Sequence, residues 1–274
     1  MSDQKFGLSL TNISGTPADE LIRIALRAGF TAVSPSFSPH IDDVCREAIS
    51  AGARLQSVHA PFGQAANMWS NDPELRRKAI DEVIPTVEAA ARYCVPVVVC
   101  HTWIGFTNDP TPTLCGLENH ERLVRRAEAL GVRIAYENTE GEGTLFALME
   151  HFKGCDTVGY CWDSGHELCY NRGTDLLERL GDRLLMTHIN DNVGITNSDG
   201  SIYFTDDLHL LPFDGKVDWQ RAAKRLSAAK MQEYINFELK LAGEGLAKEL
   251  YSSLSVEEYV REAYKRAKRL ADMI

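Results

Sequence analysis

The chain alternates between short apolar runs and longer segments with helical character. Eight short runs read as strands, and several of them are rich in Val, Ile, Tyr and Phe, which are enriched in strands. These runs cover residues 5–10, 30–37, 54–60, 95–103, 132–139, 158–164, 183–190 and 234–240. The pattern therefore predicts eight strands separated by longer connections.

Helix signals fill most of these connections. They mark residues 18–29, 74–93, 119–130, 143–152, 219–230 and 256–274. Gly29 is a natural end for the first helix, and Asp218 can cap the fifth. Ser255 and Glu258 form a capping box for the last helix. Pro85 is expected to interrupt the second helix, because proline removes a backbone donor.

Strands that alternate with helices predict an α/β protein with a parallel sheet. Eight such units in fewer than 300 residues fit a (β/α)8 TIM barrel. A doubly wound sheet is the rival fold, but no GxGxxG motif follows the first strand, so its dinucleotide-binding form is disfavoured. No Pro-, Gly- or Ser-rich linker divides the chain, so we expect one domain over residues 1–274.

The charge balance disfavours some partners. The chain has 29 Lys and Arg against 39 Asp and Glu, a formal net charge of −10. Nucleic-acid binding relies on basic residues that neutralise phosphates, so we expect no nucleic-acid partner. No apolar run reaches the roughly 18 residues that span a bilayer, so we expect no membrane association. The seven cysteines contain no CxxC pair, which favours reduced thiols in a cytoplasmic protein.

Candidate chemistry collects where the predicted strands end. In a (β/α)8 barrel, functional groups lie at the C-terminal ends of the strands and in the loops that follow. These positions carry imidazole and carboxylate side chains: His59, His101, Glu137, Asp163, His166, His188, Asp207, His209 and Glu238. The remaining histidines, His40, His120 and His151, are expected on the surface.

A single histidine at a strand end is more often a hydrogen-bonded core residue than a ligand. A single buried glutamate can instead pair with a lysine, as Glu238 could with Lys240. The joint pattern is more informative, because six successive strands end in His, His, Glu, Asp, His and Glu. Carboxylates and imidazoles gathered at one rim are the ligands of a divalent cation.

With these residues at its strand ends, the chain resembles the xylose isomerase-like TIM-barrel superfamily of sugar isomerases, ketose 3-epimerases, dehydratases and endonuclease IV. The most specific motifs are YEN at 136–138, DxxH at 163–166, THIND at 187–191 and FELK at 237–240. In the epimerases, Glu, Asp, His and Glu of four successive strands hold one metal ion. The resemblance therefore implies that Glu137, Asp163, His188 and Glu238 bind Mn²⁺, Zn²⁺ or Mg²⁺.

Endonuclease IV is similar but uses three zinc ions and nine ligands, and this sequence has a candidate for each. The resemblance implies one set of His59, His101 and Glu137, and a second set of Glu137, Asp163, His188 and Glu238. The third set is His166, Asp207 and His209. With only one metal ion, the additional histidines would bind substrate hydroxyls.

Other features favour a carbohydrate substrate over DNA. The net charge is acidic, and the first strand lacks the opening histidine motif of endonuclease IV. Aromatic residues are expected near the mouth of the site, where they can pack on sugar C–H surfaces: Phe62, Trp69, Trp103, Phe106 and Trp162. The family's Pro-Gly-x-Gly turn is here 212–215, with Phe213 in place of the first glycine.

The resemblance implies an isomerase or epimerase that acts on a small sugar or polyol-derived ketone through an enediolate. Glu137 and Glu238 are the expected acid–base pair, and His166 would orient substrate oxygens. The loop 191–217 is expected to close over the site as a lid. A homo-oligomer is compatible with the family. The alternatives are a dehydratase, a zinc-dependent phosphoester hydrolase, a non-catalytic sugar-binding relative, or one subunit of a two-chain enzyme.

Overall fold

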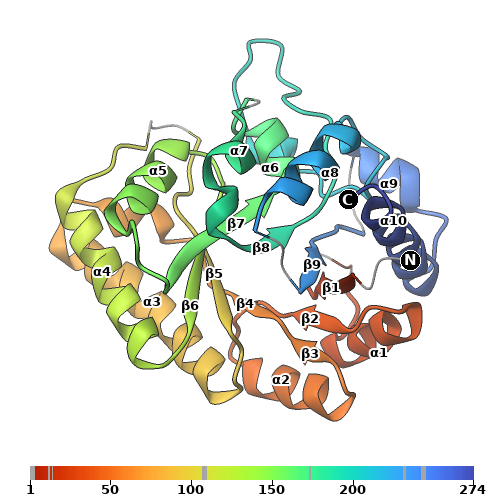
Figure 1. Ribbon diagram of the computed structural model, residues 1–274, viewed down its shortest axis with the longest axis horizontal. Helices are drawn as coiled ribbons and strands as arrows, with labels where there is room; N and C mark the ends of the chain where they lie inside the picture. Colours follow the sequence, from red (N-terminus) through yellow and green to blue (C-terminus); the bar gives the residue numbers. More distant parts are fainter. Residues whose placement is uncertain are drawn as a thin grey trace.

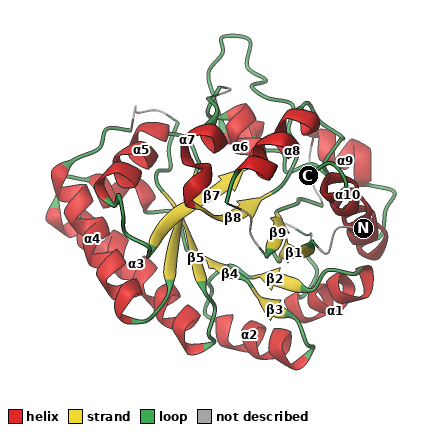
Figure 2. Cartoon of the chain, in the orientation of Figure 1, coloured by secondary structure: helices red, strands yellow, loops and turns green. Residues whose placement is uncertain are grey.

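A ring of parallel strands lies at the centre of the molecule, and the helices lie outside it (Figures 1 and 2). The computed structural model describes residues 4–11, 13, 15–106, 110–172, 174–230, 233–241 and 245–274. The strands are β1 (Lys5–Ser9), β2 (Ala32–Ser34), β3 (Arg54–Leu55), β4 (Ser57–His59), β5 (Val97–His101), β6 (Arg133–Glu137), β7 (Val158–Asp163), β8 (Leu184–His188) and β9 (Tyr234–Phe237).

The α-helices cover the outside of this ring. They are α1 (Ala18–Ala28), α2 (Ile41–Ser50), α3 (Pro73–Arg92), α4 (Leu114–Ala129), α5 (Glu142–His151), α6 (Ser164–Cys169), α7 (Leu176–Leu180), α8 (Trp219–Ala228), α9 (Gly245–Tyr251) and α10 (Val256–Ala271). Short 3-10 helices are η1 (Ala65–Trp69), η2 (Gly181–Arg183) and η3 (Phe204–Asp206). No helix in the described part of the chain combines the length and the apolar character that a membrane crossing needs.

Two parallel sheets make up the ring. One has the strand order β3-β2-β1-β9, and the other has the order β4-β5-β6-β7-β8. Single bridges join them, from Ser36 to His59 on one side and from Ile189 to Phe237 on the other. The predicted TIM barrel is confirmed, and the expected strand at 54–60 is β3 and β4 with a break at Gln56.

The alternation of side chains along the strands separates two layers of core. An apolar cluster consists of Val97, Val99, Ala135, Cys161, Leu185 and Met186. His101, Glu137 and Asp163 each follow a member of this cluster by two residues, so they point to the same side of their strands. The barrel is therefore apolar inside and becomes polar at the C-terminal ends of its strands.

Two expectations from the sequence are wrong. Pro85 does not interrupt α3, which continues to Arg92. The helix packs Val83 and Val87 against the core, and the carbonyl that proline leaves without a donor belongs to the exposed residue Asp81. His120 is not on the surface. It is buried on α4 and hydrogen-bonds the Tyr136 hydroxyl at 2.8 Å.

Asp191 organises the connection between β8 and α8. One carboxylate oxygen accepts hydrogen bonds from the backbone N–H groups of Asn192 and Val217, at 2.8 and 3.0 Å. The other accepts from the Phe213 backbone N–H and the Trp219 indole N–H, both at 2.8 Å. Asp191 is fully buried, so this one carboxylate fixes both ends of the segment whose loop projects beyond the barrel in Figure 1.

The turn at 212–215 keeps a backbone conformation that favours glycine. Phe213 has a φ of +77°, in the left-handed region, although it is not glycine. Its ring packs on Trp219 at 5.4 Å between centroids, and the guanidinium of Arg269 lies 3.8 Å from the ring centre. These contacts and the bond to Asp191 hold the strained residue in place.

Asp191→Asn is expected to destabilise the protein by about 2–4 kcal/mol, because an amide N–H₂ would face two N–H donors that have no other acceptor. Urea unfolding followed by circular dichroism measures this change. Asp182→Asn, an exposed aspartate on η2, is the matched control and should stay within about 0.5 kcal/mol of wild type. An Asp191→Asn variant as stable as this control would contradict the role given to Asp191.

Candidate functional site

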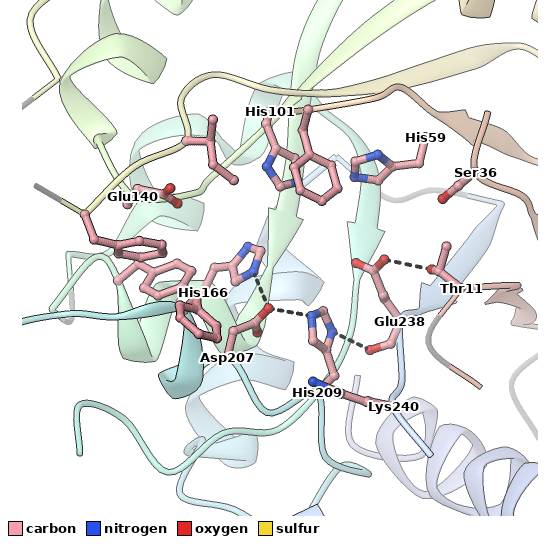
Figure 3. A pocket seen from close by; sticks show the side chains of 15 residues that line it. Thr11, Ser36, His59, His101, Glu140, His166, Asp207, His209, Glu238 and Lys240 are labelled. Atoms are coloured by element: carbon pink, nitrogen blue, oxygen red, sulfur yellow. Dashed lines mark hydrogen bonds and ion pairs between the residues drawn. The ribbon is translucent and has the colours of Figure 1, made fainter. Parts of the chain in front are cut away.

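The predicted site residues come together at one end of the barrel. Strand register places His101 beside Glu137 and Asp163 beside His188 on neighbouring strands. Parallel strands end at the same rim, so residues far apart in the sequence meet there. His59, His101, His166, Asp207, His209 and Glu238 surround the same cavity, as Figure 3 shows.

Glu137 is the centre of this arrangement and is fully buried. Its Oε1 lies 3.1 Å from His188 Nδ1 and 3.3 Å from His166 Nδ1. Its Oε2 lies 3.3 Å from His59 Nε2 and 3.5 Å from His101 Nε2. The two oxygens of one carboxylate therefore face two different pairs of imidazoles.

The donor atoms form four groups, three of which share Glu137, and in each group all donor atoms lie within 4.8 Å of one another. Three of the groups are the sets expected from the sequence: His59, His101 and Glu137; Glu137, Asp163, His188 and Glu238; and His166, Asp207 and His209. The fourth consists of Glu137, Cys161 and His188. The geometry thus brings together all nine side chains that the sequence singled out.

The charges in this site call for a cation. Glu137, Asp163, Asp207 and Glu238 are carboxylates with little or no exposure, and their ion-pair partners are imidazoles. Within the described residues, no lysine or arginine forms a salt bridge with any of the four. Buried carboxylates without compensation are costly, so this donor set fits a divalent cation.

The orientation of the imidazoles supports the same conclusion. His59, His166 and His209 each place Nδ1 against a backbone carbonyl, those of Ala60, Asn138 and Glu238, at 2.8 to 3.1 Å. A carbonyl can only accept, so Nδ1 carries a proton, and Nε2 is the ring nitrogen that faces the site and its carboxylates. Histidines that bind metals are typically held in this way.

The DxxH motif has a local structural reason. Asp163 ends β7 and caps α6, because its Oδ1 accepts the His166 backbone N–H at 2.7 Å. Its Oδ2 accepts a hydrogen bond from the Asn190 side chain at 2.8 Å. A Cβ atom on Gly165 would lie 1.9 Å from Asn190 Oδ1, so only glycine fits between the cap and Asn190. These contacts fix the Asp163 carboxylate and His166 together.

Burial and neighbouring charges set the ionisation of the site. Burial lowers the pKa of His101 to about 3, which keeps this ring neutral. Burial raises the pKa of Asp163 to about 6, although His166 opposes the shift. Burial also opposes the ionisation of Glu238, but contact with His188 outweighs it and lowers the pKa of Glu238 to about 2. Glu238 is therefore ionised and can accept a proton.

The cavity above these residues has a volume of about 270 Å³. Its wall is partly apolar, with Phe62, Ile104, Phe106, Tyr170 and Phe204. Two of the five aromatic residues expected at the mouth, Phe62 and Phe106, line this wall. Trp69 and Trp162 do not, because both are buried in the core, and Trp103 is partly buried against the core.

Several residues near the site were not expected from the sequence. The Thr11 hydroxyl donates a hydrogen bond to Glu238 Oε1 at 3.2 Å, and Ser36 lines the cavity. Both follow the first two strands, and the rule applied to later strand ends would have found them. Glu140 also lines the cavity and accepts the Gly105 backbone N–H at 2.6 Å. Cys161 lies one layer below, beside His188.

Comparison with known proteins identifies a family and relatives that are similar in sequence. A family model described as "Xylose isomerase-like TIM barrel" matches residues 22–268. The uncharacterized protein y4fM of Sinorhizobium fredii is 31% identical, over 82% of this chain and 76% of its own length. A probable endonuclease 4 of Cenarchaeum symbiosum is 26% identical, over 51% of each chain.

Solved structures share the fold along nearly the whole chain. The D-psicose 3-epimerase of Clostridium cellulolyticum H10, solved with D-tagatose, superposes with a TM-score of 0.74 at 15% identity and covers 98% of this chain and 99% of its own. The IOLI protein, solved with a zinc atom, has a TM-score of 0.72 at 17% identity and covers 98% of this chain and 97% of its own. At these identities the likeness establishes the fold alone.

Gly165→Ala is expected to destabilise the protein by about 1–3 kcal/mol, because the new methyl group would displace Asn190 and release Asp163. In an ordinary helix the same change is stabilising by roughly 0.5–1 kcal/mol, so the sign itself is informative. Chemical unfolding measures the effect. Gly63→Ala is the control, since a Cβ atom there meets no atom within 4 Å. Equal stabilities of the two variants would contradict this account of the motif.

Proposed function

Because the chain belongs to the xylose isomerase-like TIM-barrel family, we propose that it is a divalent-metal-dependent isomerase or epimerase of a small sugar or polyol-derived ketone. The observation that carries this proposal is the pair Glu137 and Glu238. They end or follow strands β6 and β9 and lie on either side of His188, whose Nδ1 is 3.1 Å from one carboxylate and 2.9 Å from the other.

In the proposed site, Glu137, Asp163, His188 and Glu238 would hold Mn²⁺, Zn²⁺ or Mg²⁺. Such a cation, when bound, polarises a carbonyl oxygen and so acidifies the neighbouring C–H group. Glu137 and Glu238 then act as the acid–base pair. One carboxylate removes a proton from the carbon beside the carbonyl, and the other returns a proton to the opposite face or to the adjacent carbon. The first outcome is epimerisation and the second is isomerisation.

The remaining polar residues would bind the substrate hydroxyl groups. His59, His101, His166, Asp207 and His209 all line the cavity and present nitrogen or oxygen atoms to it. Phe62 stacks on His101 with ring centroids 4.3 Å apart, which fixes that imidazole and adds an apolar surface. A cavity of about 270 Å³ with one lysine in its described wall suits a small, largely neutral substrate. The similar D-psicose 3-epimerase was solved with the sugar D-tagatose.

A zinc-dependent phosphoester hydrolase is the second candidate. The observation that favours it is the presence of three donor sets, as a three-zinc site requires. Two of the sets share Glu137, and the third is His166, Asp207 and His209. The probable endonuclease 4 among the relatives points the same way over half of the chain. A dehydratase would use the same acid–base pair and lose a β-hydroxyl group instead of returning the proton.

Two measurements on the purified protein separate these functions. Elemental analysis gives the number of metal ions in each chain, and proton NMR in deuterated water follows a panel of ketoses. About one ion per chain together with deuterium uptake at a carbon beside the carbonyl supports the isomerase or epimerase. Three zinc ions, no exchange in any ketose and cleavage of a phosphoester would support the hydrolase and reject the first proposal.

Glu238→Gln is expected to lower kcat for the ketose by about 10²–10⁴-fold, because the amide cannot accept the proton. Unfolding and metal content should be measured alongside kcat, so that loss of the fold or of the ion is recognised. The control is Glu233→Gln, an exposed glutamate just before β9 that pairs with Lys5. Wild-type kcat in Glu238→Gln would remove Glu238 from the acid–base role.

A further inference from the structure

His101 differs from three other histidines of the site in what contacts its Nδ1 atom. His59, His166 and His209 each have Nδ1 fixed by a backbone carbonyl. The Nδ1 of His101 is buried and has no hydrogen-bond partner among the described residues. A buried polar nitrogen without a partner costs about 1–3 kcal/mol, so a partner is expected at this position.

A small cavity lies behind His101. Its walls include Gln64, Met68, Cys100, His101, His120 and Leu123. The space open to the centre of a water molecule is about 10 Å³, which is room for a single water. An apolar cavity of this size would stay dry, but this one has two imidazoles in its wall.

His120 brings the second unpartnered nitrogen to the same cavity. It is 2% exposed and lies on α4, outside the barrel, where its ring contacts that of Trp69. Its Nδ1 is 2.8 Å from the Tyr136 hydroxyl, while its Nε2 is buried with no partner among the described residues. The same cavity is therefore lined by two histidines that each have one unsatisfied ring nitrogen.

We propose that one buried water joins Nδ1 of His101 to Nε2 of His120, and that His120 is thereby a positioning residue of the site. Nδ1–H of His101 donates to the water, the water donates to Nε2 of His120, and Nδ1–H of His120 donates to the Tyr136 hydroxyl. The lone pair of His101 Nε2 then faces the site. This gives His101 the same tautomer that backbone carbonyls impose on His59, His166 and His209.

The consequence for the site rests on the proposed function, in which His101 binds substrate or a cation, but the water and the tautomer do not. His101 ends β5, and no carbonyl of the described residues contacts its Nδ1. Its ring is therefore held by Phe62, which stacks on it, and by the proposed water at Nδ1. Partners behind a metal-binding or substrate-binding imidazole typically change affinity by about 10–100-fold.

The test combines a high-resolution crystal structure with NMR of the zinc-loaded protein. We expect one ordered water within hydrogen-bond distance of both ring nitrogens. Long-range ¹H–¹⁵N spectra of histidine-labelled protein should show His101 protonated at Nδ1. A dry cavity, a water bonded to only one ring, or a His101 protonated at Nε2 would each overturn the proposal without any variant.

Three variants extend the test to the role of His120. His120→Phe should expel the water and weaken the binding of whatever His101 holds. If His101 binds zinc with His59 and Glu137, zinc affinity falls about 10–100-fold, measured by competition with a coloured chelator. If His101 binds the ketose, KM rises. His120→Gln retains a hydrogen-bonding end and should recover much of the affinity. His151→Phe, at the surface where His151 pairs with Glu121, should match wild type. Wild-type zinc affinity together with wild-type KM in His120→Phe would reject the positioning role.

The outcomes for the water and the tautomer are independent of the proposed function. A protein with the water and the tautomer but without ketose exchange would remove the isomerase proposal and leave this one standing. A protein that exchanges ketoses but has a dry cavity would reject the bridging water and leave the isomerase proposal standing. Circular dichroism confirms that each variant is folded before its affinity is compared.

Discussion

The structure depends on four carboxylates at one rim of a barrel, three of them buried and that of Asp207 partly exposed, which pair with no lysine or arginine among the described residues. Such a cluster is stable only if every oxygen has a donor and the net charge is compensated. Its surroundings supply most of the donors, although Asp207 Oδ1 has none among the described residues. Asn190 and the N-terminus of α6 hold Asp163, Thr11 holds one oxygen of Glu238, and four imidazoles surround Glu137. The negative charge that these donors leave uncompensated is the reason a divalent cation fits the site.

The barrel makes this cluster possible by geometry. Inward side chains alternate along each strand, so an apolar layer of Val99, Ala135 and Cys161 lies directly below the polar rim. The apolar layer excludes water from beneath, which strengthens the electrostatic interactions above it. Asp191 then anchors the connection that carries Asp207 and His209, and His209 adopts a φ of +47° within it. Strain of this kind is typical of residues held for a function.

The barrel and the meeting of nine site residues at one rim could be predicted from the sequence. Each strand end can be recognised from its local pattern, and the ends of parallel strands lie at the same edge of the sheet. The sequence did not predict what depends on packing between distant segments. The surface assignment of His120 was wrong because α4 turns that residue toward Tyr136, a contact across 16 positions. Pro85 stays within α3 because tertiary packing outweighs one lost hydrogen bond. The helix over 41–50 and the short helices α6, α7 and α9 were missed, since their sequences are brief or weakly patterned.

Under the proposed functions, the number of bound cations would decide which substrate the site accepts. Glu137 presents Oε1 to His188 and His166, and Oε2 to His59 and His101, so either oxygen can be used separately. One divalent ion offsets two of the four carboxylate charges. Burial opposes the protonation of His166 and His209, but the carboxylates beside them outweigh it and raise the pKa of both imidazoles, so the one-ion site is closer to neutral and suits a neutral polyol. Three divalent ions bound to neutral imidazoles would make the same site doubly positive, which attracts a phosphoester. The donor sets suit one ion or three, so under the proposed functions the reaction would depend on how many ions the histidines beside Glu137 hold.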